Sequence, residues 1–275
     1  MCPGRGFSGG FIPMTSLLRQ RFGLAVTLLC VAAAALPCRP PLAAFQAAAT
    51  AELPVASPSR YEYRAAHDPN GTGKFYMGRE IAQVMGPGGL AWLDRPEREE
   101  EERPELVLDA MDLREGDVVA DLGAGSGYFT FRLADRVGKR GKVLAVDIQD
   151  EMLTTIRQRA AAKGVTNVEE IKSTPADPRL PAAAIDAVLM VDVYHELAYP
   201  FEVMTGVRAA LKPGGRVVFV EYRKEDPSIP IKELHKMSVD QLTKEMSAVG
   251  LVRVRTVETL PSQHIVIFQK PVAGG

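Results

Sequence analysis

The sequence predicts an α/β fold in which a doubly wound, mostly parallel sheet follows a helical N-terminal segment. Between residues 118 and 269, short apolar runs typical of buried strands alternate with stretches of helical periodicity. A glycine-rich loop at residues 123–127 joins the first of these strands to a helix. The last two strands are separated only by Pro261-Ser262, which is typical of a hairpin.

Crossover helices between parallel strands place helices on both faces of the sheet, and the closing hairpin adds one antiparallel strand at or near an edge. This domain is expected to span residues 112–275, after a helical extension at 60–111 in which residues 75–81 lead into an apolar helix. Strands are expected at 118–121, 142–147, 168–172, 185–193, 216–222, 252–260 and 264–269, and helices at 128–137, 150–163, 201–211 and 239–249.

Composition narrows the possible partners and sites. The 275 residues carry a net charge of −1, so there is no basic excess that would indicate a nucleic-acid partner. The three cysteines, Cys2, Cys30 and Cys38, precede the folded part, which excludes from it a thiol nucleophile, a thiolate metal site and a disulfide framework. Histidines and carboxylates are too scattered along the chain to predict a metal site.

The N-terminus is typical of a targeting segment. Arg19 and Arg21 precede an apolar run at residues 22–36, small residues follow, and no acidic residue occurs before Glu52. We expect residues 1–46 to be a signal peptide for export to the periplasm or the exterior, with a linker at 47–59. An organellar transit peptide and a membrane anchor are the alternatives, although a stable span needs about 20 apolar residues. Either Met1 or Met14 can be the start.

The glycine loop predicts a ligand site. Gly123, Gly125 and Gly127 allow a tight turn and close approach of a ligand to the backbone, at a helix N-terminus that offers free N–H groups. Asp147 ends the next strand, where an acidic residue binds ribose hydroxyls in dinucleotide folds. Asp121 at the loop entrance would repel a pyrophosphate and attract an ammonium group. An adenosyl ligand with an amino-acid tail is therefore favoured, and an NAD-dependent oxidoreductase is the less favoured alternative.

Three motifs then occur in order, at residues 118–130, 143–149 and 210–221. Together they resemble the motifs of class I S-adenosylmethionine-dependent methyltransferases. The resemblance is closest to the branch with quinone C-methyltransferases and arsenite methyltransferases, although the cysteines that arsenite chemistry needs are missing from the body of the chain. It implies S-adenosylmethionine as cofactor and the strand order 3-2-1-4-5-7-6, with strand 7 antiparallel.

The resemblance also implies the cofactor contacts. The glycine loop would line the methionine portion, Asp121 would hold its amino group, and Asp147 and Ile148 would contact ribose and adenine. Relatives place an acidic residue for the adenine amino group where this chain has Ala176, so Asp177 is the substitute that we expect. The expected cofactor-binding residues are Asp121, Gly123, Ala124, Gly125, Gly127, Asp147, Ile148, Asp177 and Asp192.

Methyl transfer requires alignment of the acceptor, and a general base only where the acceptor must lose a proton. Tyr194, His195 and Glu196 follow a central strand and are the candidates to deprotonate or orient a small-molecule acceptor; the alternative is that they only begin and cap the next helix. Residues 75–79 with Trp92 are expected to form a lid or to pack on the sheet edge. The acidic run at 97–105 is expected to be a solvated helix face. A non-catalytic or accessory ligand-binding protein of the same fold is the rival function. The acceptor, the atom methylated and the oligomeric state are left open.

Overall fold

The apolar runs from residue 118 onward form a mixed sheet in the computed structural model, which describes residues 59–272. These residues lie in the compact unit that spans Ala56–Gly275. The predicted targeting segment, and all but the last residue of the predicted linker, lie outside them. None of the helices in residues 59–272 is long and apolar enough to cross a membrane.

The order of the strands confirms the predicted topology. The sheet runs β10-β11-β8-β7-β4-β5-β6, which in order along the domain is 3-2-1-4-5-7-6 read from the far edge. Strand β11 is antiparallel to both of its neighbours, and a short β9 pairs with β8 outside this path. The strands are β4 (Val118–Leu122), β5 (Lys142–Asp147), β6 (Val168–Lys172), β7 (Ile185–Val191), β8 (Leu211–Arg223), β9 (Lys236–Met237), β10 (Val252–Val257) and β11 (Gln263–Gln269).

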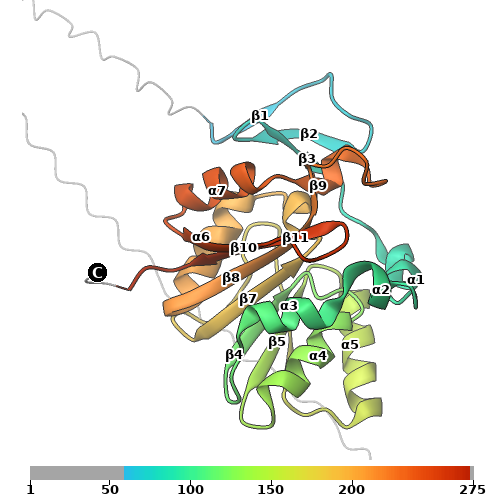
Figure 1. The fold of residues 1–275 in the computed structure, drawn as a ribbon, viewed down its shortest axis with the longest axis vertical. Coiled ribbons are helices and arrows are strands. Elements are labelled where there is room, and N and C mark those ends of the chain that lie inside the picture. The colour runs from blue at the N-terminus through green and yellow to red at the C-terminus, as the bar shows by residue number, and fades with distance from the viewer. Residues whose placement is uncertain (1–58, 273–275) are drawn as a thin grey trace, which may run out of the picture. The chain divides into compact units, whose positions relative to one another are not determined.

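Helices cover both faces of this sheet (Figure 1). On one face, Leu133 and its neighbours pack against alternate strand residues such as Val119. On the other face, Met204 packs against the intervening residues, such as Ala120. Helices α3 (Pro104–Met111), α4 (Tyr128–Val137) and α5 (Asp150–Lys163) lie on the first face, and α6 (Pro200–Ala210) and α7 (Val239–Ala248) on the second.

The prediction of a helical extension at 60–111, in which residues 75–81 lead into an apolar helix, is wrong in its first part. The structure has a three-stranded antiparallel sheet there, formed by β1 (Tyr61–Tyr63), β2 (Gly71–Tyr76) and β3 (Arg79–Ala82). Met77 and Gly78 connect β2 to β3 with φ angles of 50° and 94°. Two consecutive positive φ angles are the geometry of a two-residue hairpin turn, which glycine favours. Helical structure begins only at η1 (Pro87–Gly89) and continues through α1 (Leu90–Leu93) and α2 (Arg98–Glu102).

A buried ion pair ties this small sheet to the main domain. The Arg79 guanidinium contacts the Glu245 carboxylate of α7 through Nε and Nη2, at 2.9 and 3.1 Å. Tyr194 donates its hydroxyl to the same carboxylate at 2.6 Å, and Arg79 Nη1 donates to the carbonyl of His195 at 3.1 Å. Glu245 is fully buried. The pair therefore fixes the loop after β7 as well as the N-terminal sheet.

Replacing Glu245 by Ala should lower the free energy of unfolding by about 3–5 kcal/mol, because the Arg79 charge would stay buried without a partner. Urea unfolding followed by circular dichroism measures this. The matched control is Glu169→Ala, since the Glu169–Lys142 pair is exposed and its loss should cost at most about 1 kcal/mol. Equal losses in the two variants would contradict this account.

Candidate functional site

A cavity of about 860 Å³ lies at the carboxyl ends of β4, β5 and β7. Its volume is near the top of the range of about 300–1,000 Å³ for ligand pockets, and its position is where doubly wound sheets bind ligands. The structure brings most of the predicted site residues together here. Those that line the cavity are Asp121, Gly123, Ala124, Gly125, Asp147, Ile148, Asp192, His195 and Glu196.

The glycine loop bends between β4 and α4 as the sequence predicts. Gly123, Gly125 and Gly127 have φ angles of 77°, 55° and 82°, a region that disfavours other residues. A Cβ atom at Gly123 would lie 2.4 Å from Cγ2 of Val193, so the loop also needs glycine to approach the chain after β7. Gly127 does not line the cavity: it faces Phe131 and begins α4. Its part in the site is therefore conformational.

Asp147 is placed for two hydroxyl groups. The carboxylate is 6% exposed and accepts N–H groups from Gly125 on Oδ2 and from Gln149 on Oδ1, each at 2.9 Å. Burial raises its pKa. Each carboxylate oxygen can accept a second hydrogen bond, so capacity for a ribose diol remains. Ile148, 38% exposed beside it, offers an apolar surface for a flat ring.

Two further buried carboxylates line the cavity. Asp121 accepts the Thr130 hydroxyl at 2.6 Å, and burial raises its pKa to about 6. Asp192 accepts Gln263 Nε2 at 2.7 Å on Oδ2, whereas its Oδ1 has no partner among residues 59–272. Burial raises the pKa of Asp192 well above its usual range. A cation in the cavity would stabilise the ionised form of both carboxylates.

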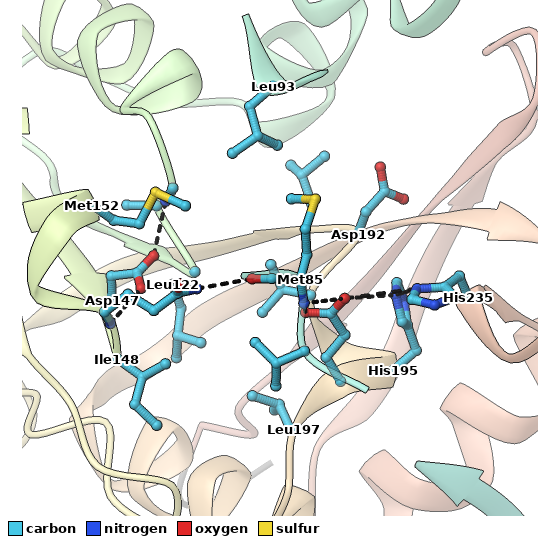
Figure 2. Close-up of a pocket in the computed structure, with 18 of the residues that line it drawn as sticks. Met85, Leu93, Leu122, Asp147, Ile148, Met152, Asp192, His195, Leu197 and His235 are labelled. Carbon is cyan, nitrogen blue, oxygen red and sulfur yellow. Dashed lines mark hydrogen bonds and ion pairs between the residues drawn. The ribbon is translucent and has the colours of Figure 1, made fainter. Parts of the chain in front are cut away.

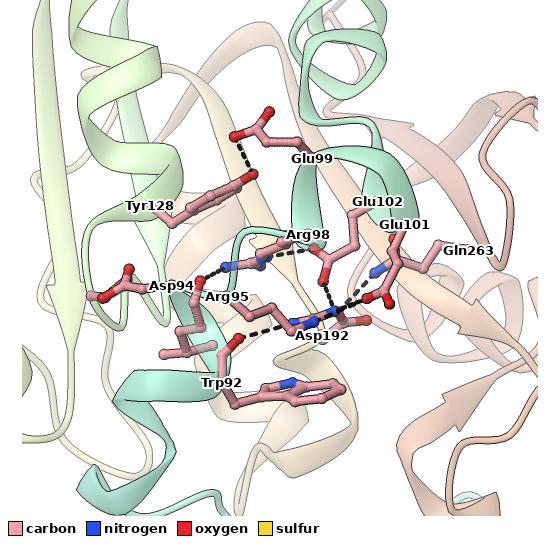
Figure 3. A network of polar contacts seen from close by, with 12 residues as sticks. Trp92, Asp94, Arg95, Arg98, Glu99, Glu101, Glu102, Tyr128, Asp192 and Gln263 are labelled. Carbon is pink, nitrogen blue, oxygen red and sulfur yellow. Dashed lines mark hydrogen bonds and ion pairs between the residues drawn. The ribbon is translucent and has the colours of Figure 1, made fainter.

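The segment of α1 and α2 contacts the glycine loop, where the sequence indicated only a solvated acidic face. Figure 3 shows the polar network of this segment, with Asp94, Arg98 and Glu102 labelled. Asp94 accepts the Ser126 hydroxyl of the loop at 2.7 Å. Arg98 and Glu102, only 5% and 3% exposed, pair at 2.7 Å and both line the cavity. The acidic run at 97–105 therefore contributes a buried ion pair between residues one helical turn apart. An expectation that the whole run is solvated does not predict this pair.

The expected lid is placed differently. Trp92 lines the cavity, but residues 75–79 belong to the β2–β3 hairpin and do not. The segment that crosses the cavity instead is the strap at residues 83–86 (Figure 2). Met85 accepts Gln149 Nε2 at 3.0 Å through its carbonyl and donates its N–H to the Glu196 carboxylate at 3.2 Å. The strap thus joins the Asp147 side of the cavity to the Glu196 side, and no motif in the sequence indicated it.

A polar cluster closes the other end of the cavity. His195 Nδ1 lies 2.6 Å from Glu221 Oε2, and His195 Nε2 lies 3.0 Å from His235 Nδ1. Burial lowers the pKa of both imidazoles to about 4, so both are neutral near pH 7. Burial raises the pKa of the Glu221 carboxyl. The sequence singled out His195 and Glu196 but not His235, which lies 40 residues away along the chain.

Besides Gly127, two predicted residues do not reach the cavity. The Tyr194 side chain is fully buried and donates to Glu245, so it positions the loop rather than facing an acceptor. Asp177 is exposed, does not line the cavity, and accepts the Arg179 N–H at 2.8 Å. Ser173, Thr174 and Pro175 line that side instead. The adenine end of the site therefore has no acidic side chain from this loop.

Comparison with known proteins gives the family. A family described as "Methyltransferase domain" matches residues 113–264. The chain belongs to this family. A crystal structure of an S-adenosylmethionine-dependent methyltransferase from Aquifex aeolicus superposes with a TM-score of 0.64 and 28% identity, over 68% of this chain and all of that one. This confirms the predicted fold, and the oxidoreductase alternative is set aside.

Curated relatives point to one branch. Ubiquinone/menaquinone biosynthesis C-methyltransferase UbiE of Francisella tularensis is 27% identical over 148 residues, which is 54% of this chain and 58% of that protein. The protein of the same name from Salmonella arizonae is 30% identical over 120 residues, 43% and 48% of the two chains. The chain thus spans about half the length of these relatives.

The described residues fit S-adenosylmethionine. Asp147 offers acceptors for the ribose diol, Ile148 an apolar face for adenine, and the glycine loop a close approach for the methionine portion. The orphaned Oδ1 of Asp192 and the buried Asp121 suit a ligand that carries an ammonium and a sulfonium group. The chain thus carries an S-adenosylmethionine-dependent methyltransferase domain.

Asp147→Ala should weaken binding of S-adenosylmethionine at least tenfold, because two hydroxyl acceptors are lost from a buried site. Isothermal titration calorimetry measures the affinity, and circular dichroism checks that the variant folds. Asp177→Ala, the same substitution outside the cavity, should bind as the original protein does. An unchanged affinity in Asp147→Ala would show that the ribose lies elsewhere.

Proposed function

We propose that this protein transfers a methyl group from S-adenosylmethionine to a small, largely apolar molecule. The observation that carries the proposal is that one cavity joins the Asp147 end to the His195 end. Ligand pockets of about 300–1,000 Å³ enclose most of a drug-sized molecule. A cavity of about 860 Å³ therefore has room for a small acceptor beside the cofactor. Apolar and aromatic side chains such as Val84, Trp92 and Leu197 line the space between the two ends.

S-adenosylmethionine would supply a methyl group activated by its sulfonium: an acceptor atom attacks the methyl carbon in line, and the thioether sulfur is the leaving group. The residues of this chain contribute binding and alignment. Asp147 and the glycine loop hold the donor end, and the strap at 83–86 with α1 excludes water from above it. His195, Glu196 and His235 form the polar end, which orients an acceptor through a hydroxyl, thiol or similar group.

The relatives name a chemical class for the acceptor. The UbiE proteins are named as C-methyltransferases of ubiquinone and menaquinone biosynthesis. We propose an acceptor of comparable chemistry, a small ring compound with a polar substituent. The aromatic residues Trp92, Phe129 and Tyr222 that line the cavity support a flat, apolar acceptor. The absence of cysteine from residues 59–272 weighs against arsenite as acceptor.

A transfer assay tests this function. The full chain is incubated with S-adenosylmethionine labelled in its methyl group and with small-molecule fractions of a cell extract, alongside quinols, catechols and thiols. Label should enter a small-molecule fraction, and Asp147→Ala should lower the rate at least tenfold, whereas Asp177→Ala should leave it unchanged. If the protein binds the cofactor and no fraction accepts label, the accessory, non-catalytic function replaces the proposed one.

We also propose that residues 1–46 direct the protein out of the cytoplasm. The acid-free stretch with Arg19, Arg21 and the apolar run at 22–36 supports export. Fractionation of bacteria that produce the full chain should find it outside the cytoplasm, with a new N-terminus after the small residues near Ala43 and Ala44. A variant without residues 1–46 should stay inside. The uncleaved full chain in the cytoplasm would contradict the proposal.

A further inference from the structure

Three side chains at the polar end of the cavity converge on one point. His195 Nε2 lies 3.0 Å from His235 Nδ1, and Glu196 Oε1 lies 3.9 and 3.7 Å from these two nitrogens. All three residues line the cavity (Figure 2). They come from two different elements, η2 (Tyr194–Glu196) and η3 (Glu233–His235), so their convergence is a property of the fold. The sequence, in which they are scattered, predicted no metal site.

The distances between the two imidazole nitrogens and the Glu196 oxygen fit coordination of a metal ion better than direct hydrogen bonding among the three side chains. Three points with these separations lie on a circle whose radius is about 2.1 Å, and zinc binds imidazole nitrogen and carboxylate oxygen at about 2.0–2.2 Å. Without a cation, the two imidazole nitrogens share one hydrogen bond of 3.0 Å, and within residues 59–272 the Glu196 carboxylate accepts hydrogen bonds only from the Met85 N–H. Two histidines and one carboxylate are a donor set of catalytic zinc sites.

The surroundings hold His195 as a ligand is usually held. Glu221 Oε2 lies 2.6 Å from His195 Nδ1, so the carboxylate can accept an Nδ1–H, and in that tautomer the lone pair of Nε2 points toward His235 and Glu196. Metal-bound histidines commonly donate their other ring N–H to a carboxylate, which fixes the tautomer and raises the basicity of the ligand. Glu221 is fully buried and also accepts the backbone N–H of Tyr194 at 3.0 Å.

We propose that His195, Glu196 and His235 bind a divalent cation of the zinc type, with Glu221 as the positioning residue. Two cations lie near the three side chains. Arg79, which contacts the His195 carbonyl, is paired with Glu245, so its charge is offset within the site. Lys232 lines the cavity near His235. Three protein ligands leave a coordination position open toward the cavity. A hydroxyl or thiol group of the acceptor can take that position, where the metal lowers its pKa.

Zinc binding to the full chain, freed of metal by a chelator and studied without S-adenosylmethionine, tests the proposal apart from the methyltransferase activity. Calorimetry should find one Zn²⁺ per chain. His235→Gln and Glu196→Gln should each weaken binding at least tenfold, and Glu221→Gln by about 10–100-fold, as for other residues that orient a ligand. Co²⁺ in place of Zn²⁺ should give a visible spectrum that both ligand variants change.

Two controls keep the outcome specific. His67→Gln replaces a histidine of the N-terminal sheet outside the cavity and should bind zinc unchanged. Replacement of Cys2, Cys30 and Cys38 by Ser should also leave binding unchanged. Absence of zinc binding by the original chain, loss of binding in the cysteine-free chain, or equal affinity of His235→Gln and the original would each overturn the proposal.

Discussion

The Glu221 carboxylate is the contact on which the geometry of the site depends. Glu221 follows the last residue of β8 that pairs with β7, and from there its carboxylate accepts the backbone N–H of Tyr194 and faces His195 Nδ1. A buried carboxylate is costly unless its oxygens are hydrogen-bonded, and both oxygens have partners here. The loop after β7 therefore has one arrangement that satisfies Glu221, and this arrangement sets the direction of His195.

A second constraint acts on the same loop from the opposite side. The Arg79–Glu245 pair links β3 to α7, and both partners also contact the loop, Arg79 through the His195 carbonyl and Glu245 through the Tyr194 hydroxyl. The strap at residues 83–86 follows β3 directly and contacts Glu196 and Gln149. The N-terminal sheet is thus part of the site: it delivers the strap that separates the cavity from solvent and joins its two ends.

Much of the fold could be predicted because its signals are local. Strand and helix periodicities, together with the right-handed crossover rule, leave few topologies, and the glycine loop marks the ligand end of the sheet.

The hairpin at Met77–Gly78 could not be predicted, because apolar spacing over a few residues does not separate strand from helix and the turn depends on backbone angles. The burial of Arg98 and Glu102 could not be predicted because charges one turn apart are usually solvated, whereas these two neutralise each other on the buried face of α2. The placement of His235 beside His195 depends on how β9 pairs with β8, a long-range fact that no local pattern contains.

Ionised carboxylates in the site lower the stability of the folded protein, and bound ligands can offset this loss. Burial raises the pKa of Asp121, Asp147 and Asp192, so the folded state prefers their protonated forms. For Asp121, the folded pKa of about 6 lies above the usual 3.8. Its contribution to stability is therefore fully present below about pH 4 and is lost as the pH rises through 6. At neutral pH the ionised form of Asp121 destabilises the ligand-free fold, and a bound cationic donor offsets that cost. Cofactor binding and stability are thus linked through carboxylates that three different strands bring to one cavity.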